Sequence, residues 1–225
     1  MKIIVTAGPT REHLDPVRFL SNPSTGKMGF AIAAEAARRG HEVVLVAGPV
    51  ALKTPERVRR VDVTSAREML AAVEGAVRTS KTSGTSRTVV IGTAAVADWR
   101  PAKCAAQKLK KGEMSGVLRL VRNPDILKSI AKTRGRKTED VRLVGFAAET
   151  NDVLKEAARK CREKGLSFIV ANDVTKKGSG FGTDTNKVTF VFPDGTMKRF
   201  PLMTKRMVAK RILDAVSSVA AGREE

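Results

Sequence analysis

The stretch Ser21-Asn22-Pro23-Ser24-Thr25-Gly26-Lys27-Met28-Gly29 follows a predicted first strand at residues 3–7 and a predicted loop at residues 8–20. It opens a predicted helix that runs to about residue 39. Small residues and glycines at the start of a helix can direct several backbone N–H groups at one anion. Lys27 adds a positive charge at the same point. The sequence therefore predicts a phosphate or carboxylate site at its first strand-to-helix junction.

Two familiar nucleotide-binding motifs do not fit this stretch. A Walker A loop requires glycine where Ser21 stands, and serine or threonine where Met28 stands. A dinucleotide fingerprint requires three glycines directly after the strand and an acidic residue near the end of the second strand. That second strand, predicted at residues 42–47, ends in Gly48-Pro49. NAD is therefore disfavoured, and the glycines at 26 and 29 are open to a second interpretation, close packing of the helix on the sheet.

Strand and helix patterns alternate along the rest of the chain. Further strands are predicted at residues 58–63, 89–92, 141–146 and 168–171, and helices at residues 65–77 and 152–164 and from Pro124 onward, with a surface loop at residues 78–87. Such alternation is typical of an α/β fold with a doubly wound, mostly parallel, Rossmann-like sheet. We predict a single domain that spans residues 1–225.

The C-terminal part departs from this alternation. Residues 187–201 have the pattern of a β-hairpin that turns at Asp194-Gly195, and a final helix is predicted at residues 204–219. The hairpin is expected either to extend the sheet in the antiparallel direction or to form a dimer contact.

Composition narrows the class of protein. The chain has 225 residues and a formal net charge of +19, with 42% hydrophobic and 4% aromatic residues. It is long enough to bury a substantial core, and no apolar run is long enough to cross a membrane. Few aromatics and widely spread Lys and Arg disfavour a nucleic-acid-binding module. Two histidines do not make a His-rich metal site, and Cys104 and Cys161 are expected to be free thiols in a cytoplasmic protein.

Glycines, amides and carboxylates follow the predicted strands. They occupy residues 8–11, 22–29, 92–100, 145–150 and 172–173. In doubly wound sheets the ligand lies beyond the carboxyl ends of the strands. We therefore expect these segments to converge on one site.

Six motifs occur in order along the chain: Ser21-Asn22-x-Ser24-x-Gly26-Lys27-Met28-Gly29, Ala94-Ala95-Val96-Ala97-Asp98, Lys108-Leu109-Lys110-Lys111, Asn123-Pro124-Asp125-Ile126, Gly145-Phe146-Ala147-Ala148-Glu149-Thr150 and Ala171-Asn172-Asp173. Together they resemble the phosphopantothenate–cysteine ligase family of coenzyme A biosynthesis, over nearly the whole chain. The resemblance implies two steps. The carboxylate of 4′-phosphopantothenate attacks the α-phosphorus of CTP and pyrophosphate leaves; the amine of L-cysteine then displaces CMP from the acyl cytidylate.

The resemblance also implies roles for residues at matching positions. Asn22 and Lys108 are the implied catalytic residues. The implied nucleotide-binding residues are Gly92, Thr93, Ala94, Asp98, Lys108, Asn123, Pro124, Asp125, Ile126, Phe146, Lys160 and Lys164, and the implied acyl-substrate contacts are Asn22, Ser24, Gly26, Lys27 and Ala95. No dedicated metal site is expected, because Mg²⁺ would arrive with the triphosphate.

Elementary chemistry is consistent with these roles. The amide of Asn22 can stabilise the oxyanion that forms when the amine attacks. Lys108 lies on a charged segment that we interpret as a lid over the nucleotide phosphates, and alignment alone favours it over Lys110 and Lys111. Asp98 suits a ribose hydroxyl or the base, or simply a turn. Lys160 and the lysine four residues later share a helix face, which is a surface pattern unless they point at phosphates.

Several expectations stay open at this stage. The family implies a homodimer. Its bacterial members carry this domain after a flavin-dependent decarboxylase domain, so a separate flavin-dependent decarboxylase is the expected pathway neighbour. Bacterial relatives prefer CTP and eukaryotic ones use ATP. The resemblance of residues 108–111 and of the pair Lys160 and Lys164 to the bacterial type favours CTP, but recognition of the base through backbone groups cannot be read from side chains. The rival hypotheses are an NAD(P)-dependent reductase, disfavoured because the chain has no tyrosine, and a basic nucleic-acid-binding module, supported by charge alone.

Overall fold

The computed structural model describes residues 1–82, 87–113, 116–134, 141–149, 152–173, 178–180 and 182–220. Its helices are α1 (Lys27–Arg38), α2 (Ala66–Thr82), α3 (Ile126–Arg134), α4 (Val153–Glu163) and α5 (Lys205–Ala220), with one 3-10 turn, η1 (Lys111–Glu113). The strands of the central sheet are β1 (Lys2–Ala7), β4 (Glu42–Ala47), β5 (Val58–Asp62), β6 (Thr88–Gly92), β9 (Val141–Glu149), β10 (Phe168–Asp173), β12 (Val188–Val191) and β13 (Met197–Arg199).

The central sheet is doubly wound. In the described residues its eight strands run in the order β13-β12-β10-β9-β6-β1-β4-β5. β1 pairs in parallel with β4 on one side and with β6 on the other, so the strand order reverses at the β1–β6 boundary. β12 pairs antiparallel with β10, and β13 with β12. The predicted α/β class is therefore confirmed, and the C-terminal hairpin extends the sheet.

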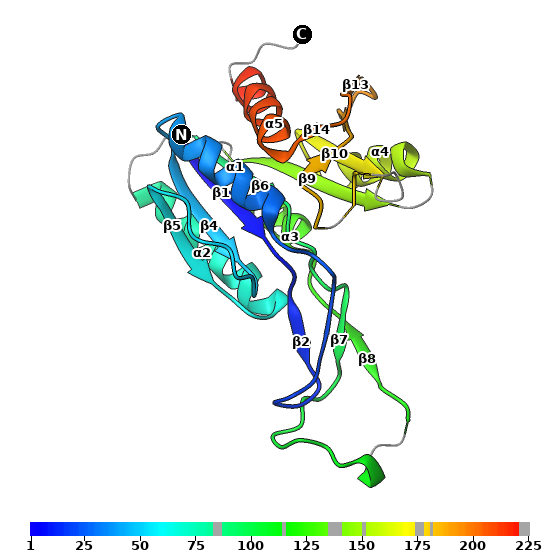
Figure 1. The fold of residues 1–225 in the computed structure, drawn as a ribbon. Coiled ribbons are helices and arrows are strands. Elements are labelled where there is room, and N and C mark those ends of the chain that lie inside the picture. The colour runs from blue at the N-terminus through cyan, green and yellow to red at the C-terminus, as the bar shows by residue number, and fades with distance from the viewer. Residues whose placement is uncertain are drawn as a thin grey trace.

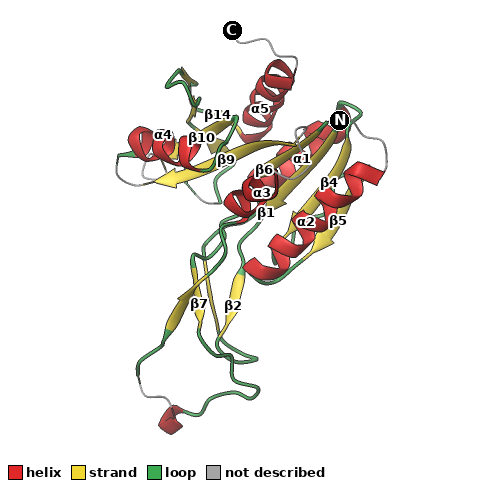
Figure 2. Cartoon of the chain, turned by 180° about the vertical axis from the view of Figure 1, so that it is seen from behind, coloured by secondary structure: helices red, strands yellow, loops and turns green. Residues whose placement is uncertain are grey.

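Two apolar layers cover the faces of this sheet. Alternation along β1 sends Ile3 and Val5 into one layer with α1 and α5, and Ile4 into the other with α2, α3 and α4. Figures 1 and 2 show these helices on opposite faces. Burial on both faces explains why the inner strands are continuous runs of valine, isoleucine and leucine.

A long arm projects from the carboxyl edge of the sheet (Figure 1). It consists of two antiparallel ribbons, β2 (Arg11–His13) with β3 (Phe19–Ser21) and β7 (Trp99–Pro101) with β8 (Leu120–Arg122), and β2 packs beside β7. We call residues 11–21 and 99–122 the arm. The base of the arm is attached to the start of α2, because Glu12 Oε1 accepts a hydrogen bond of 2.9 Å from Ala66 N. The prediction of a plain loop at residues 8–20 is therefore wrong.

Three other boundaries differ from the prediction. β9 continues to Glu149, so Phe146 lies inside a strand rather than at its end. α2 continues to Thr82 and includes the first part of the predicted loop, whose residues 83–86 lie outside the described ones. Asp125 Oδ1 accepts a bond of 3.0 Å from Lys128 N and caps α3, so Pro124 precedes the cap instead of starting the helix.

A last small ribbon, β11 (Thr185–Asn186) with β14 (Met203–Thr204), connects the loop after β10 to the start of α5. This pairing brings residues 182–186 beside the N-terminus of α1. Within the described chain, no helix is both long and apolar enough to cross a membrane.

Candidate functional site

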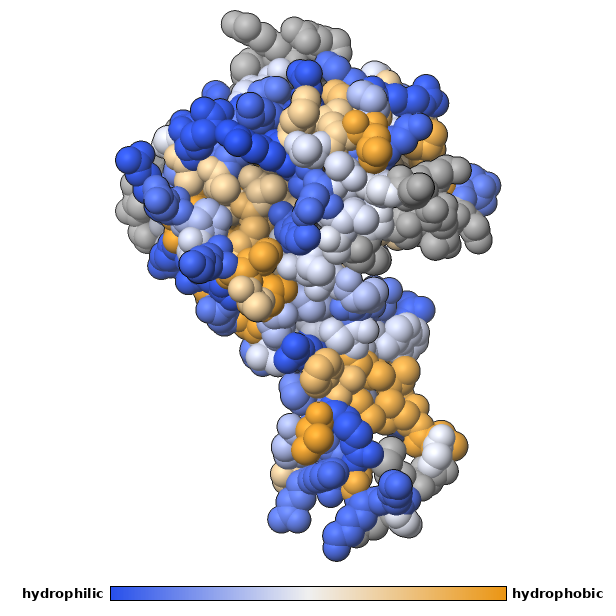
Figure 3. Space-filling view, in the orientation of Figure 1, coloured by the Kyte–Doolittle hydropathy of each residue, from blue (hydrophilic) through white to orange (hydrophobic). Residues whose placement is uncertain are grey.

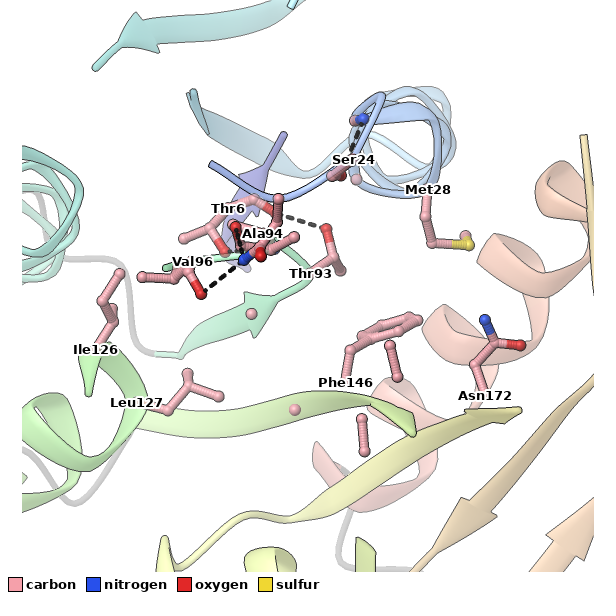
Figure 4. Close-up of a pocket in the computed structure, with 18 of the residues that line it drawn as sticks. Thr6, Ser24, Met28, Thr93, Ala94, Val96, Ile126, Leu127, Phe146 and Asn172 are labelled. Carbon is pink, nitrogen blue, oxygen red and sulfur yellow. Dashed lines mark hydrogen bonds between the residues drawn. The ribbon is translucent and has the colours of Figure 1, made fainter. Parts of the chain in front are cut away.

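A cavity of about 510 Å³ lies where the strand order reverses, beyond the carboxyl ends of β1, β6 and β9. Its walls come from the start of α1, the segment after β6, the start of α3, and α4 (Figure 4). The cavity brings together every residue that the family resemblance implied except Lys108. These are Asn22, Ser24, Gly26, Lys27, Gly92, Thr93, Ala94, Ala95, Asp98, Asn123, Pro124, Asp125, Ile126, Phe146, Lys160 and Lys164.

Two glycines shape the start of α1 for different reasons. Gly26 has a φ of 77°, in the left-handed region that favours glycine, and no side chain caps the helix there. The first N–H groups of α1 therefore remain available to an anion. A Cβ on Gly29 would lie 2.5 Å from the Cβ of Ala7 and 3.0 Å from the carbonyl oxygen of Thr6. Close packing on the sheet thus explains Gly29, and the turn explains Gly26.

Two lysines flank one carboxylate beside this helix start. Lys27 Nζ lies 2.7 Å from Asp184 Oδ1 and donates to the carbonyl of Gly182 at 2.9 Å. The hydrogen bond from Lys27 and its charge lower the pKa of Asp184. Lys205 is 8% exposed and bonds to the carbonyl of Thr183; burial and the charge of Lys27 lower the pKa of Lys205. This wall of the cavity carries more positive than negative charge and attracts anions.

The segment after β6 is bonded to β1 and to the loop before α1. Thr93 Oγ1 donates to the carbonyl of Thr6 at 2.5 Å. Asn22 Nδ2 donates to the carbonyls of Ala95 and Val96, at 3.1 and 3.2 Å. The side-chain N–H groups of Asn22, which we predicted to stabilise an oxyanion, therefore donate to backbone oxygens in this structure. Asn22 must exchange at least one of these bonds before it can donate to a reacting group.

The opposite wall is assembled around the start of α3. Asn123 Nδ2 donates to Ala97 O and Asn123 N to Asp98 O, both at 2.8 Å. Lys164 Nζ lies 2.7 Å from Asp125 Oδ2. Burial alone would raise the pKa of Asp125, but the hydrogen bonds it accepts, chiefly from Lys164, outweigh burial and lower it. Asp125 therefore stays ionised and orders Lys164 at the cavity edge.

Phe146 and Lys160 complete this wall. Because Phe146 and Ala147 alternate in β9, Ala147 packs in the layer of α2, α3 and α4 while the half-buried Phe146 ring turns to the other side, toward the cavity (Figure 4). Lys160 reaches the same cavity from α4. An aromatic face beside cationic side chains suits a base and its phosphates.

Lys108 lies elsewhere. It is exposed on the arm, between β7 and η1, and does not line the cavity of its own chain. The family-implied role of this lysine therefore stays a prediction that requires the arm to reach a cavity.

Sequence reasoning gave no roles to three cavity residues. Asn172 and Ser179 exchange bonds of 2.8 and 2.5 Å that fix the loop after β10. Asn186 is 4% exposed, and its Oδ1 has no partner among the described residues, which leaves it for a ligand donor. Lys205 is the third, after Asn172 and Asn186. Asn172 stands in the predicted motif Ala171-Asn172-Asp173 but has no predicted role of its own, Asn186 ends a glycine-rich loop at residues 176–186 that is expected near the site or the dimer contact, and Lys205 follows no motif. Residue 150 of a predicted motif and residues 176, 177 and 181 of this loop lie outside the described ones.

The acidic groups of the described chain do not form a metal centre, because no three of its His, Cys, Asp or Glu side chains lie together in a metal-binding arrangement. The polar donors of the site are backbone N–H groups, lysines and amides. Such groups bind a polyanion directly.

The family model described as "DNA/pantothenate metabolism flavoprotein C-terminal domain" matches residues 1–219. The chain belongs to this family. It is 46% identical over 219 residues to the coenzyme A biosynthesis bifunctional protein CoaBC of Escherichia coli strain K12, an alignment that covers 96% of this chain and 51% of that protein. The chain thus spans about half the length of the curated relatives it matches.

Solved structures agree with this membership. The crystal structure of the C-terminal domain of CoaBC has a TM-score of 0.79 and 43% identity, with 98% of each chain covered. A Cab2 mutant in complex with phosphopantothenate-cysteine shares the fold, with a TM-score of 0.75 and 15% identity over 100% of this chain and 89% of that one. The resemblance inferred from the sequence is confirmed.

Proposed function

We propose that this chain is a phosphopantothenate–cysteine ligase that uses CTP. The observation that carries the proposal is the single cavity in which a helix N-terminus, four lysines and an aromatic ring from distant segments of the chain meet, in a chain of this family. The names of the relatives support it: CoaBC acts in coenzyme A biosynthesis, and the Cab2 mutant binds phosphopantothenate-cysteine.

In this proposal the nucleotide occupies the α3–α4 side of the cavity. Phe146 packs against the nucleoside, Asp98 accepts a bond from a ribose hydroxyl, and Lys160 and Lys164 face the phosphates. The N–H groups at the start of α3 add donors to the same side. Mg²⁺ would come with the triphosphate, where it neutralises phosphate charge.

The acyl substrate then occupies the α1 side. Its carboxylate oxygen attacks the α-phosphorus, an O–P bond forms, and pyrophosphate leaves. The amine of L-cysteine next attacks the acyl carbon, a C–N bond forms, a proton is lost and CMP leaves. Asn22 exchanges a carbonyl bond for the oxyanion of this second step. Lys27 exchanges Asp184 for an anion, because an ion pair with so exposed a carboxylate contributes little to stability.

The arm makes a homodimer part of the proposal. Lys108 does not line the cavity of its own chain. In the proposal, the Lys108 side chain of a second copy reaches this cavity instead. The arm also exposes large apolar side chains, namely Val17, Phe19, Trp99, Val117, Leu118 and Leu120. Figure 3 shows a hydrophobic patch on the surface of the arm. We therefore place the dimer contact on the arm rather than on the C-terminal hairpin. A cytoplasmic location and a flavin-dependent decarboxylase as neighbour stay predictions.

Pyrophosphate release tests the function. CTP is incubated with and without 4′-phosphopantothenate, L-cysteine is added, and CMP is counted; parallel reactions contain ATP. We expect release that requires 4′-phosphopantothenate, CMP that appears on addition of cysteine, and a preference for CTP. Folded protein that releases pyrophosphate with neither nucleotide would overturn the proposal.

A further inference from the structure

Asp15 is an unusual residue in the arm. Among the described residues 13–20 and 102–120 it is the one buried side chain, with 0% exposure. A buried carboxylate is costly unless hydrogen bonds compensate for lost water. Oδ1 accepts from the backbone N–H groups of Val17 and Arg18, both at 2.8 Å. Oδ2 accepts from Arg18 Nε at 2.9 Å and from Arg18 NH2 at 2.5 Å.

The same carboxylate reaches the second ribbon of the arm. Leu109 N donates to Asp15 Oδ2 at 3.2 Å, and the carbonyl of Leu109 accepts from Arg18 NH2 at 2.7 Å. Ala105 N donates to Leu14 O at 2.8 Å, four residues earlier in the same segment. Both backbone groups of Leu109 are therefore held by one ion pair, and the segment is pinned at two points.

Lys108 directly precedes the anchored Leu109 in the chain. Residues 102–110 have no helix or strand of their own, and Lys108 is exposed. A lysine on such a segment samples many positions, so fixing its side chain against a ligand costs conformational entropy. Because the backbone of the neighbouring Leu109 is already fixed, Lys108 loses less of this entropy when the ligand binds.

We propose that Asp15 is a positioning residue, which clamps the backbone of Leu109 and so presents Lys108 to the nucleotide phosphates. The proposal rests on the ligase function and on the role of Lys108 proposed above. Burial would raise the pKa of Asp15, but the bonds from Arg18 and the backbone N–H groups lower it, so the clamp stays ionised at neutral pH.

Asp15→Asn is a selective test. Its remaining carbonyl oxygen still accepts from Val17 and Arg18 N–H, whereas an NH₂ group replaces Oδ2 and cannot accept from Leu109. Asp15→Ser is a second variant that keeps the turn and cannot reach Leu109. Asp62→Asn is the matched control, because Asp62 is exposed and pairs with Arg60 on β5.

Two measurements decide the proposal. The first is the KM for CTP in pyrophosphate release, measured for Asp15→Asn, Lys108→Ala and the double variant. We expect each single variant to raise this KM about tenfold, the double variant to match Lys108→Ala, and the KM for L-cysteine to stay within about twofold. An unchanged KM, or an effect that multiplies fully with Lys108→Ala, would overturn the proposal.

The second measurement needs no activity. Trypsin cleavage after Lys108, Lys110 and Lys111 is timed by mass spectrometry in wild type and in each variant. We expect cleavage there to accelerate about fivefold or more in Asp15→Asn and Asp15→Ser and to stay unchanged in Asp62→Asn, because cleavage follows local opening. Equal cleavage rates in the wild type and the Asp15 variants would refute the clamp even if the ligase function holds. If the wild type has no ligase activity but the Asp15 variants are still cleaved faster than the wild type, the function is refuted and the clamp is kept.

Discussion

The sheet body and the arm are held together in different ways. The body buries large apolar side chains completely, such as Phe168 and Ile4, in two layers. The arm buries a carboxylate, Asp15, and leaves Val117 82% exposed. A body of this kind is stable by itself, whereas the arm depends on hydrogen bonds and on an apolar surface that a second copy would cover. The cavity that we propose to be catalytic lies in the body, and the one implied catalytic residue outside it lies on the arm.

The largest effect is expected from the body core. Phe168→Ala removes a ring that packs against Phe190 and Phe192, and it should lower the free energy of unfolding by about 3–5 kcal/mol. Val117→Ala in the arm should change the free energy of unfolding of the dissociated subunit by no more than about 0.5 kcal/mol, because this side chain is 82% exposed there. Urea titration monitored by circular dichroism measures both. Similar losses for the two variants would contradict the distinction between body and arm.

The second effect concerns the dimer. Val117→Asp places a charge in the proposed contact and should weaken the dimer about 100-fold or more, because an unpaired buried charge is costly. Met197→Asp in the C-terminal hairpin is the matched control and should leave it unchanged, although Met197 is 39% exposed. Sedimentation equilibrium measures the dissociation constant. The opposite pattern would move the interface to the hairpin.

The third effect concerns the cavity wall in the body. Lys164→Ala removes a charge beside Asp125 and should raise the KM for CTP about tenfold, which corresponds to about 1.4 kcal/mol of lost binding. Lys155→Ala changes the same residue type in α4 at an exposed position outside the cavity and should leave the KM unchanged. Steady-state pyrophosphate release gives both values; equal KM values in the two variants would remove Lys164 from the nucleotide side.

The smallest effect is expected on the pH dependence of the stability of the body. Hydrogen bonds from Arg38, and then from Arg39, lower the pKa of the buried Glu35 from 4.5 to about 2. Because the folded pKa is the lower one, Glu35 stabilises the fold above pH 4.5, and this contribution is lost as pH falls toward 2. Glu35→Gln should therefore unfold more easily at pH 7 and lose less stability on acidification. Thermal midpoints between pH 7 and 3 test this, and parallel curves for wild type and Glu35→Gln would contradict it.

The body was predictable from the sequence and the arm was not. Apolar runs such as Val43-Val44-Leu45-Val46 mark buried parallel strands, and the sheet then brings the segments after them to one edge. The strands β7 and β8 have three residues each, contain arginines and lie almost twenty residues apart, so no local period marks their pairing. For the same reason no local pattern gave Asn186 or Lys205 a role in the cavity: a two-strand ribbon, β11 with β14, brings them there.

A mixing experiment tests the central claim that the arm of one copy completes the cavity of another. Asn22→Asp disables the cavity, and Lys108→Ala lowers the activity that depends on the arm about tenfold when CTP is kept well below the wild-type KM. When the subunits re-associate at random, half of the dimers contain one copy of each variant. In each mixed dimer, one of the two sites combines an intact cavity with an intact arm. The activity should therefore recover to about a quarter of the wild-type activity. A mixture no more active than its separate parents, in dimers shown to have exchanged subunits, would contradict the account.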